Sequence, residues 1–266
     1  EIAPYAFANT GVTDVNLPSG LETIGDYAFY SATKLVDITI PGSVKTIGVG
    51  AFRDCWKMTK ATLPEGLETI PRQCFIGCRK LESVNIPDSV TTIGNMAFTG
   101  CALKEINISK NLTDISIPGY TFSGCPAAIT VDAANPNYNA DERGVLYNKD
   151  KSLLLHCPNF EKAFTFDINC NIDQYAFYNC ANLTDVTFSY AIKKIPYAAF
   201  RNCCSLKITT VPDTVRMIDQ VAFDGCGMTE FYLPDSVEYV GTQAFSSTPL
   251  THFEFNDKVD TFKNIF

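Results

Sequence analysis

The sequence predicts a solenoid of stacked repeats, and two observations support this prediction. A phenylalanine, usually preceded by alanine, recurs at intervals of 22 to 24 residues, with one longer interval of 55. A short alternation of apolar and polar residues, typical of a β-strand, recurs within these intervals. A unit of this length cannot bury its apolar face alone, so neighbouring units must stack and share one core. The recurring residues are Phe7, Phe29, Phe52, Phe75, Phe98, Phe122, Phe177, Phe200, Phe223 and Phe245.

One regular unit shows how each repeat is built. Leu35 opens a segment in which the alternation directs Ile38 and Ile40 inward and Thr39 outward. Pro41 follows and ends the strand, because proline has no backbone donor. This L-x-x-L-x-L pattern is the strand signature of a leucine-rich repeat. We therefore predict a leucine-rich-repeat solenoid (α/β class, rich in β structure) of about ten stacked repeats of about 23 residues. A parallel β-sheet should form one face, and short turns or 3-10 or helical segments the other.

The recurring aromatic and glycine positions predict the interior of this solenoid. Each repeat phenylalanine should be buried against its equivalents in the neighbouring turns. A glycine recurs between the strand and the phenylalanine at positions 25, 48, 94 and 241. These glycines should mark tight bends or a close approach of two backbones.

Composition excludes several classes of partner. The chain has 46% hydrophobic and 19% charged residues, which is enough apolar surface for a substantial core. Its net charge is −8, and no Lys/Arg cluster is present, so nucleic acid and anionic membranes are not expected partners. No apolar run approaches the roughly 20 residues of a membrane helix. The first four residues, Glu-Ile-Ala-Pro, show no signal peptide.

Seven of the eleven cysteines form a ladder. Each lies three residues after a repeat phenylalanine, and the same position in the outer repeats holds Thr10, Ala32 and Thr248. A position that accepts Cys, Thr or Ala is expected to be small, buried and partly polar. Structural packing is therefore the favoured interpretation, although disulfides between neighbouring turns and metal binding remain as alternatives. The ladder consists of Cys55, Cys78, Cys101, Cys125, Cys180, Cys203 and Cys226.

The other four cysteines occupy different positions. Cys74 and Cys170 replace small or apolar core residues, and Cys204 directly follows a ladder cysteine. Cys157 lies within the longest interval of the repeat. We expect it to be an exposed, reactive thiol.

The chain is expected to be one solenoid domain, residues 1–266, that starts and ends in the middle of a repeat. Ile2 and Phe7 match Ile24 and Phe29, and no polar capping repeat is evident at either end. Residues 126–166 form the predicted insertion. Apolar segments at 144–147 and 152–155 flank a polar turn, which predicts a β-hairpin. The insertion either extends the sheet or serves as a recognition loop, with Tyr138 and Tyr147 as candidate contacts.

The outward positions of the strands form the candidate binding surface. Most of them hold Thr, Asn or acidic residues, which suit exposed strands in any protein. Tyrosine flanked by charged residues is instead typical of interfaces. The candidate partner-binding residues on the strands are Glu230, Tyr232, His252, Glu254 and Asp185.

No enzyme chemistry is evident, and we expect no catalytic residues, cofactor or metal site. The two histidines, His156 and His252, lie about a hundred residues apart. His156 adjoins Cys157, but adjacent side chains on a strand point to opposite faces, which disfavours a nucleophilic dyad. Acidic side chains on parallel strands could form a calcium site or a carboxylate pair, but one carboxylate per turn does not supply converging ligands.

The repeat unit I-P-x-S-V-x-x-I-G-x-x-A-F-x-x-C-x-x-L-x-x-V, present at residues 40–61 and 86–106 with small variations, resembles the BspA-like leucine-rich repeat family. The segment 144–151 also looks like one found inside members of that family. The resemblance spans nearly the whole chain. It implies a secreted or cell-surface protein of bacterial type, in a family whose members bind host proteins such as fibronectin and fibrinogen or mediate adhesion.

These observations predict a non-enzymatic protein-interaction module, extracellular or at the cell surface. The resemblance implies adhesion to extracellular matrix or plasma proteins, or to other cells. One alternative is a structural spacer that presents another domain. A remote alternative is a carbohydrate-active hydrolase.

Overall fold

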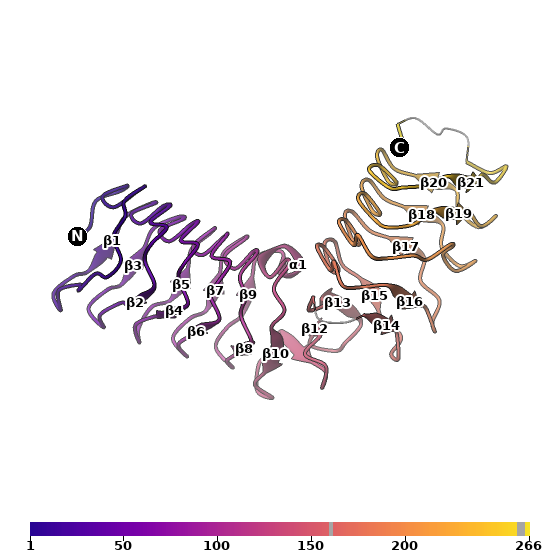
Figure 1. Cartoon of the computed structure of the whole chain (residues 1–266). Coiled ribbons are helices and arrows are strands. Elements are labelled where there is room, and N and C mark those ends of the chain that lie inside the picture. The colour runs from indigo at the N-terminus through magenta and orange to yellow at the C-terminus, as the bar shows by residue number, and fades with distance from the viewer. Residues whose placement is uncertain (160–161, 260–263) are drawn as a thin grey trace. The chain divides into compact units, whose positions relative to one another are not determined.

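The structure is a computed structural model and describes residues 1–159, 162–259 and 264–266 (Figure 1). The chain divides into two compact units, Glu1–Gly144 and Val145–Phe266. In each unit, short parallel strands recur once per repeat and lie in two rows. The chain is thus a β-solenoid of about ten turns with very little helix, which confirms the predicted solenoid.

The first row of strands occupies the L-x-x-L-x-L segments. Ile38 pairs in register with Ala61, and Ala61 with Val84, so equivalent core residues of successive repeats lie side by side. In the first unit these strands are β2 (Asp37–Thr39), β4 (Lys60–Thr62), β6 (Ser83–Asn85), β8 (Glu105–Ile108) and β10 (Ala128–Val131). In the second they are β14 (Ala163–Thr165), β16 (Asp185–Thr187), β19 (Glu230–Tyr232) and β21 (His252–Glu254).

A second row of parallel strands, each of two residues, was not expected from the sequence. Its inner residue is usually isoleucine, as in the register pairs Ile24–Ile47 and Ile70–Ile93. The outer residue faces solvent, so even two extended residues are enough to bury one side chain and pair with the next turn. The first unit contains β1 (Thr23–Ile24), β3 (Thr46–Ile47), β5 (Thr69–Ile70), β7 (Thr92–Ile93) and β9 (Asp114–Ile115). The second contains β15 (Asn171–Ile172), β17 (Lys194–Ile195), β18 (Met217–Ile218) and β20 (Tyr239–Val240).

Turns connect the second row to the repeat phenylalanine. The one helix among the described residues, α1 (Pro118–Thr121), is a single turn at this point of one repeat. No helix in the described part of the chain is long and apolar enough to cross a membrane.

The repeat phenylalanines form the predicted buried stack. In the first unit, the ring centroids of Phe29, Phe52 and Phe75 are 5.3 and 5.5 Å apart, with nearly parallel rings. In the second unit, Phe177 and Phe200 stack at 4.8 Å. All five rings are fully buried. The offset stacking adds to the hydrophobic gain from burial and holds each turn to the next.

The recurrent glycines permit neighbouring turns to approach closely. A Cβ atom at Gly48 would overlap the backbone of Asp26, and one at Gly94 would overlap the backbone of Arg72. The second row can therefore pair only because these positions have no side chain. This confirms the close backbone approach expected from the sequence.

The first row of the first unit is interrupted between β6 and β8. The strands β2, β4 and β6 form one ladder, and β8 pairs with β10 in another. The break coincides with a change in a short spacer. The next core residue after Cys78 is Leu81, three positions later, whereas the next one after Cys101 is Leu103, only two positions later. The ladder ends at this shorter repeat, and Lys104 N–H still donates to the carbonyl of Glu82 in the preceding turn at 3.2 Å.

The first row of the second unit is also interrupted, between β16 and β19. The spacer is three positions from Cys203 to Leu206 and two from Cys226 to Met228. The strand after the shorter spacer, β19, forms a ladder with β21, and its Tyr232 N–H donates to the carbonyl of Thr209 in the preceding turn at 2.8 Å. Residues 207–210 occupy the place of a first-row strand in this repeat but are not in one.

The predicted hairpin is present. The strands β12 (Leu146–Asn148) and β13 (Leu153–His156) are antiparallel, with Tyr147 opposite Leu154. β13 also pairs in parallel with β15, so the hairpin extends the second row of the second unit. In the first unit, β11 (Tyr138–Ala140) follows β10. The proposed boundaries of the insertion, 126–166, include residues 160 and 161, which lie outside the described residues.

Replacing Phe75 by alanine should lower the free energy of unfolding by about 3–5 kcal/mol, because it removes a fully buried ring and leaves a cavity between two others. Urea unfolding followed by circular dichroism measures this change. The exposed aromatic Trp56 provides the control, since Trp56→Ala should change the stability by no more than about 0.5 kcal/mol. Equal losses for the two variants would contradict the stacked core.

Candidate functional site

Four of the sequence-predicted residues meet on the exposed face of β19 and β21. The parallel register places Glu230 beside His252 and Tyr232 beside Glu254. The rings of Tyr232 and His252 lie 5.5 Å apart between centroids. The Tyr232 hydroxyl donates to Glu230 Oε2 at 3.3 Å. We call Glu230, Tyr232, His252 and Glu254 the tyrosine patch.

The alternation of the two strands fixes the orientation of the patch. Between Glu230 and Tyr232 lies Phe231, which is fully buried and stacks on Phe253 of β21 at 5.9 Å. A buried aromatic ring on the inner face directs both neighbouring side chains outward. The core of the solenoid therefore determines where the patch points.

The electrostatic environment of Tyr232 is negative. The charge of Glu230 raises the pKa of Tyr232 above its ordinary value, and Glu254 adds to the effect. The ring is nevertheless 39% exposed. The patch thus offers solvent an uncharged aromatic ring between two carboxylates.

The remaining predicted contacts lie elsewhere. Asp185 is exposed at the start of β16, on the same row but two repeats before Glu230. Tyr147 is fully buried in the core of the second unit. Tyr138 is also buried, and its hydroxyl accepts the backbone N–H of Ile115 at 2.8 Å. Neither tyrosine presents its ring to a partner, so their assignment as contacts is corrected: both are core residues.

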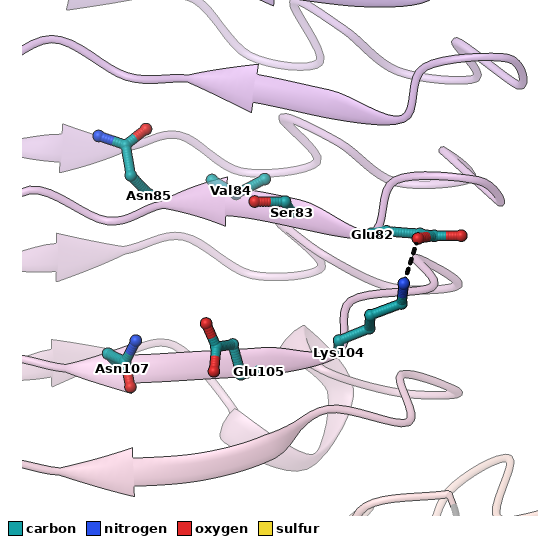
Figure 2. Close-up of a pocket in the computed structure, with 7 residues that line it drawn as sticks. All are labelled: Glu82, Ser83, Val84, Asn85, Lys104, Glu105 and Asn107. Atoms are coloured by element: carbon teal, nitrogen blue, oxygen red, sulfur yellow. Dashed lines mark ion pairs between the residues drawn. The ribbon is translucent and has the colours of Figure 1, made fainter.

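The sequence did not indicate a hollow of about 560 Å³ between β6 and β8, where the ladder is interrupted (Figure 2). Lys104 Nζ pairs with Glu82 Oε2 at 2.6 Å on one side of it. Glu105 and Asn107 extend from β8 near Ser83 of β6 (Figure 2). The signal that could have located it is the shortened spacer before Leu103.

Two further hollows adjoin residues already described. One of about 330 Å³ shares Asn107 with the first hollow and includes Asp88, Ser109, Thr130 and Asp132. The other, of about 380 Å³, lies beside the tyrosine patch and shares His252 with it. Its lining residues are Phe245, Ser247, Thr248, Leu250, Thr251, His252, Phe253 and Phe266.

The cysteine ladder has a structural role. All its members are buried, and none is in a disulfide. Cys78 Sγ donates to the carbonyl oxygen of Phe52 in the preceding turn at 3.0 Å, and Cys203 Sγ does the same with Phe177. In the outer repeats, the Thr10 hydroxyl reaches the carbonyl of its own Phe7 at 2.7 Å. A small side chain fits this position, and where it is Cys or Thr it also donates to a phenylalanine carbonyl, which confirms the packing interpretation.

The expectation for Cys157 was wrong. Its side chain is 1% exposed, because the strand that precedes it directs the thiol into the core of the second unit. The exposed cysteine is Cys204. Burial raises the pKa of Cys125 to about 11, and it also raises the pKa values of Cys74 and Cys101, so these thiols remain protonated at neutral pH.

Thiol labelling should therefore distinguish one cysteine from the other ten by its rate of reaction. In the folded chain, Ellman's reagent should react rapidly with one thiol, Cys204, because the others are buried. In urea all eleven should react. A Cys204→Ser variant should show no rapid phase. A second rapid thiol in that variant would contradict the burial of the ladder.

His156 lies in β13 and is buried. Burial lowers the pKa of His156 to about 3 from its ordinary value of 6.5. The unfolded chain therefore binds a proton that the folded chain excludes, and stability falls as the pH drops from about 6.5 toward 3.

Between pH 7 and pH 5 this group should reduce the free energy of unfolding by about 2 kcal/mol. Urea unfolding at both pH values measures the loss. The loss of unfolding free energy between pH 7 and pH 5 should be smaller by about 2 kcal/mol in His156→Gln than in the parent chain. His252→Gln, at an exposed site, should show the same loss as the parent chain. An unchanged pH dependence in His156→Gln would refute this assignment.

Among the described residues, no group of three or more His, Cys, Asp or Glu side chains is placed to hold a metal ion. The acidic side chains on the strands stand one per turn.

The stacked parallel strands and the buried phenylalanine and cysteine columns define a leucine-rich-repeat solenoid. The BspA type leucine rich repeat region matches residues 1–129 and 155–266 in six copies. The chain therefore belongs to the BspA-type leucine-rich-repeat family.

Two crystal structures are similar to the whole chain. One is a leucine rich cell surface protein from Faecalibacterium prausnitzii A2-165, with 28% identity and a TM-score of 0.69 over 98% of this chain and 83% of that one. The other is the pneumococcal vaccine antigen PcpA, with 18% identity and a TM-score of 0.67 over 97% of this chain and 64% of that one. The similarity to PcpA, at 18% identity, concerns the fold alone. No curated protein matches the chain.

Proposed function

We propose that this chain is a protein-interaction module displayed outside the cell, and that it binds its partner through the tyrosine patch. The patch supports the proposal because it combines exposed aromatic and charged side chains on a rigid sheet. Tyrosine is enriched at protein interfaces because its ring is large and its hydroxyl can form a hydrogen bond. Strand pairing and a buried Phe231 hold the patch in place before any partner arrives, which reduces the entropy lost on binding.

The family and the similar structures support the same function. The chain belongs to a family of leucine-rich repeat proteins, not of enzymes, and one similar structure is a cell surface protein. We propose the same location for this chain, and adhesion to extracellular matrix or plasma proteins, or to other cells, as its role. We also propose that residues 1–266 act as one solenoid domain, with 126–166 as an insertion.

Biolayer interferometry against immobilised fibronectin and fibrinogen, with albumin as control, tests this function. We expect saturable binding to one of the first two. A triple variant with alanine at Glu230, Tyr232 and Glu254 should bind at least tenfold more weakly, because truncation of an aromatic interface residue commonly costs more than 1 kcal/mol. The matched control replaces Glu105 and Asn107, which are exposed at the equivalent positions of β8, and should bind as the parent does.

Circular dichroism must show that both variants remain folded. Binding that survives the triple variant would move the site away from the tyrosine patch while retaining the function. Absence of binding to both fibronectin and fibrinogen would contradict this adhesion role and favour a spacer that presents another domain.

A further inference from the structure

We propose that the tyrosine patch recognises a basic side chain, arginine or lysine, of the partner protein. This inference rests on the proposed function and adds the chemistry of the contact. The cation would lie against the exposed ring of Tyr232, between the carboxylates of Glu230 and Glu254.

The geometry of the patch suits a cation. Glu230 precedes Tyr232 on the same outward face of β19, and Glu254 lies beside Tyr232 on β21. A cation within about 6 Å of a tyrosine ring is attracted to its face, and flanking carboxylates strengthen the attraction. An arginine can also form paired hydrogen bonds with a carboxylate. Ring and carboxylates together provide both kinds of contact within one register pair.

The hydrogen-bonding groups of the patch favour a donor ligand. Two carboxylates provide acceptors only, the Tyr232 hydroxyl already donates to Glu230 at 3.3 Å, and the neutral His252 imidazole adds one donor and one acceptor. The backbone carbonyl of Tyr232 accepts the Thr210 hydroxyl at 2.9 Å. Guanidinium and ammonium groups are donors only. Acceptors outnumber free donors in the patch, which therefore matches a basic side chain.

Comparison with equivalent strands supports a specific role for Tyr232. The same outward position holds Thr187 and Thr210 in the two preceding repeats. The strand that follows the shortened spacer in the first unit, β8, has Glu105 and Asn107 where β19 has Glu230 and Tyr232. The acidic residue is thus present in both units, but the aromatic ring is present only in the second.

The residue directly before the acidic position also differs between the two strands, β8 and β19. In the first unit, Lys104 directly precedes Glu105 and pairs with Glu82 at 2.6 Å. The residue that precedes Glu230 is Thr229. The position directly before the acidic residue therefore holds a lysine at β8 and a neutral threonine at β19, where the lysine of that column, Lys207, lies one repeat earlier.

The experiment uses the full chain and a fluorescent peptide that contains four arginines separated by glycine and serine. A second peptide has citrulline at the same four positions, which keeps the shape but removes the charge and replaces two of the five N–H donors by one carbonyl acceptor. Fluorescence anisotropy at physiological salt measures both affinities. We expect the arginine peptide to bind at least fivefold more tightly than the citrulline peptide.

Three substitutions locate the contact. Tyr232→Ala should weaken binding of the arginine peptide at least fivefold, and Tyr232→Phe should restore most of the affinity because it retains the ring. Glu230→Gln should weaken binding about threefold or more. The matched control Glu105→Gln makes the same change in net charge at the equivalent position of β8 and should have no effect.

Two results would overturn the proposal: equal binding of the two peptides, or equal losses for Glu230→Gln and Glu105→Gln, which would indicate attraction to the net negative charge of the chain. Either result leaves the proposed function intact if the triple alanine variant still loses its protein partner. Conversely, site-specific binding of the arginine peptide would support the contact even when fibronectin and fibrinogen do not bind.

Discussion

Every turn of this solenoid depends on the repeat phenylalanine, which contacts the neighbouring turn through both its ring and its backbone. Phe52 illustrates this. Its ring stacks between Phe29 and Phe75, its N–H donates to the carbonyl of Cys74 at 3.0 Å, and its own carbonyl accepts the thiol of Cys78 at 3.0 Å. The side chain provides burial, and the backbone groups that would otherwise be buried without partners are satisfied by the next turn.

The small residues of the repeat follow from this contact. Turns that stack at the distance between two aromatic rings leave room for a thiol or a hydroxyl beside the carbonyl of Phe52, and for no side chain at Gly48. The cysteine ladder and the recurrent glycine are therefore consequences of one spacing. Both features serve the packing of one turn against the next.

The same spacing makes the exposed face of the sheet a regular support for variable residues. Each strand fixes one inward residue, such as Phe231, and thereby orients the two outward residues on either side of it. Substitution of the outward residues changes the surface without disturbing the core. The tyrosine patch and the polar hollow beside Glu105 are two different surfaces built on equivalent strands.

The sequence by itself determined the stacked repeats, the first row of strands, the phenylalanine core, the hairpin and the neighbourhood of Glu230, Tyr232, His252 and Glu254. These features depend on periodicity, because residues one repeat apart must lie side by side in a parallel stack. Only the tertiary structure decided the second row of strands, because its isoleucine recurs in the repeat unit but two extended residues are too few to show the alternation of a strand. It also placed Tyr138, Tyr147 and Cys157 inside the protein. These three lie in the long interval between repeats, where no period indicates which face of the chain packs against the core.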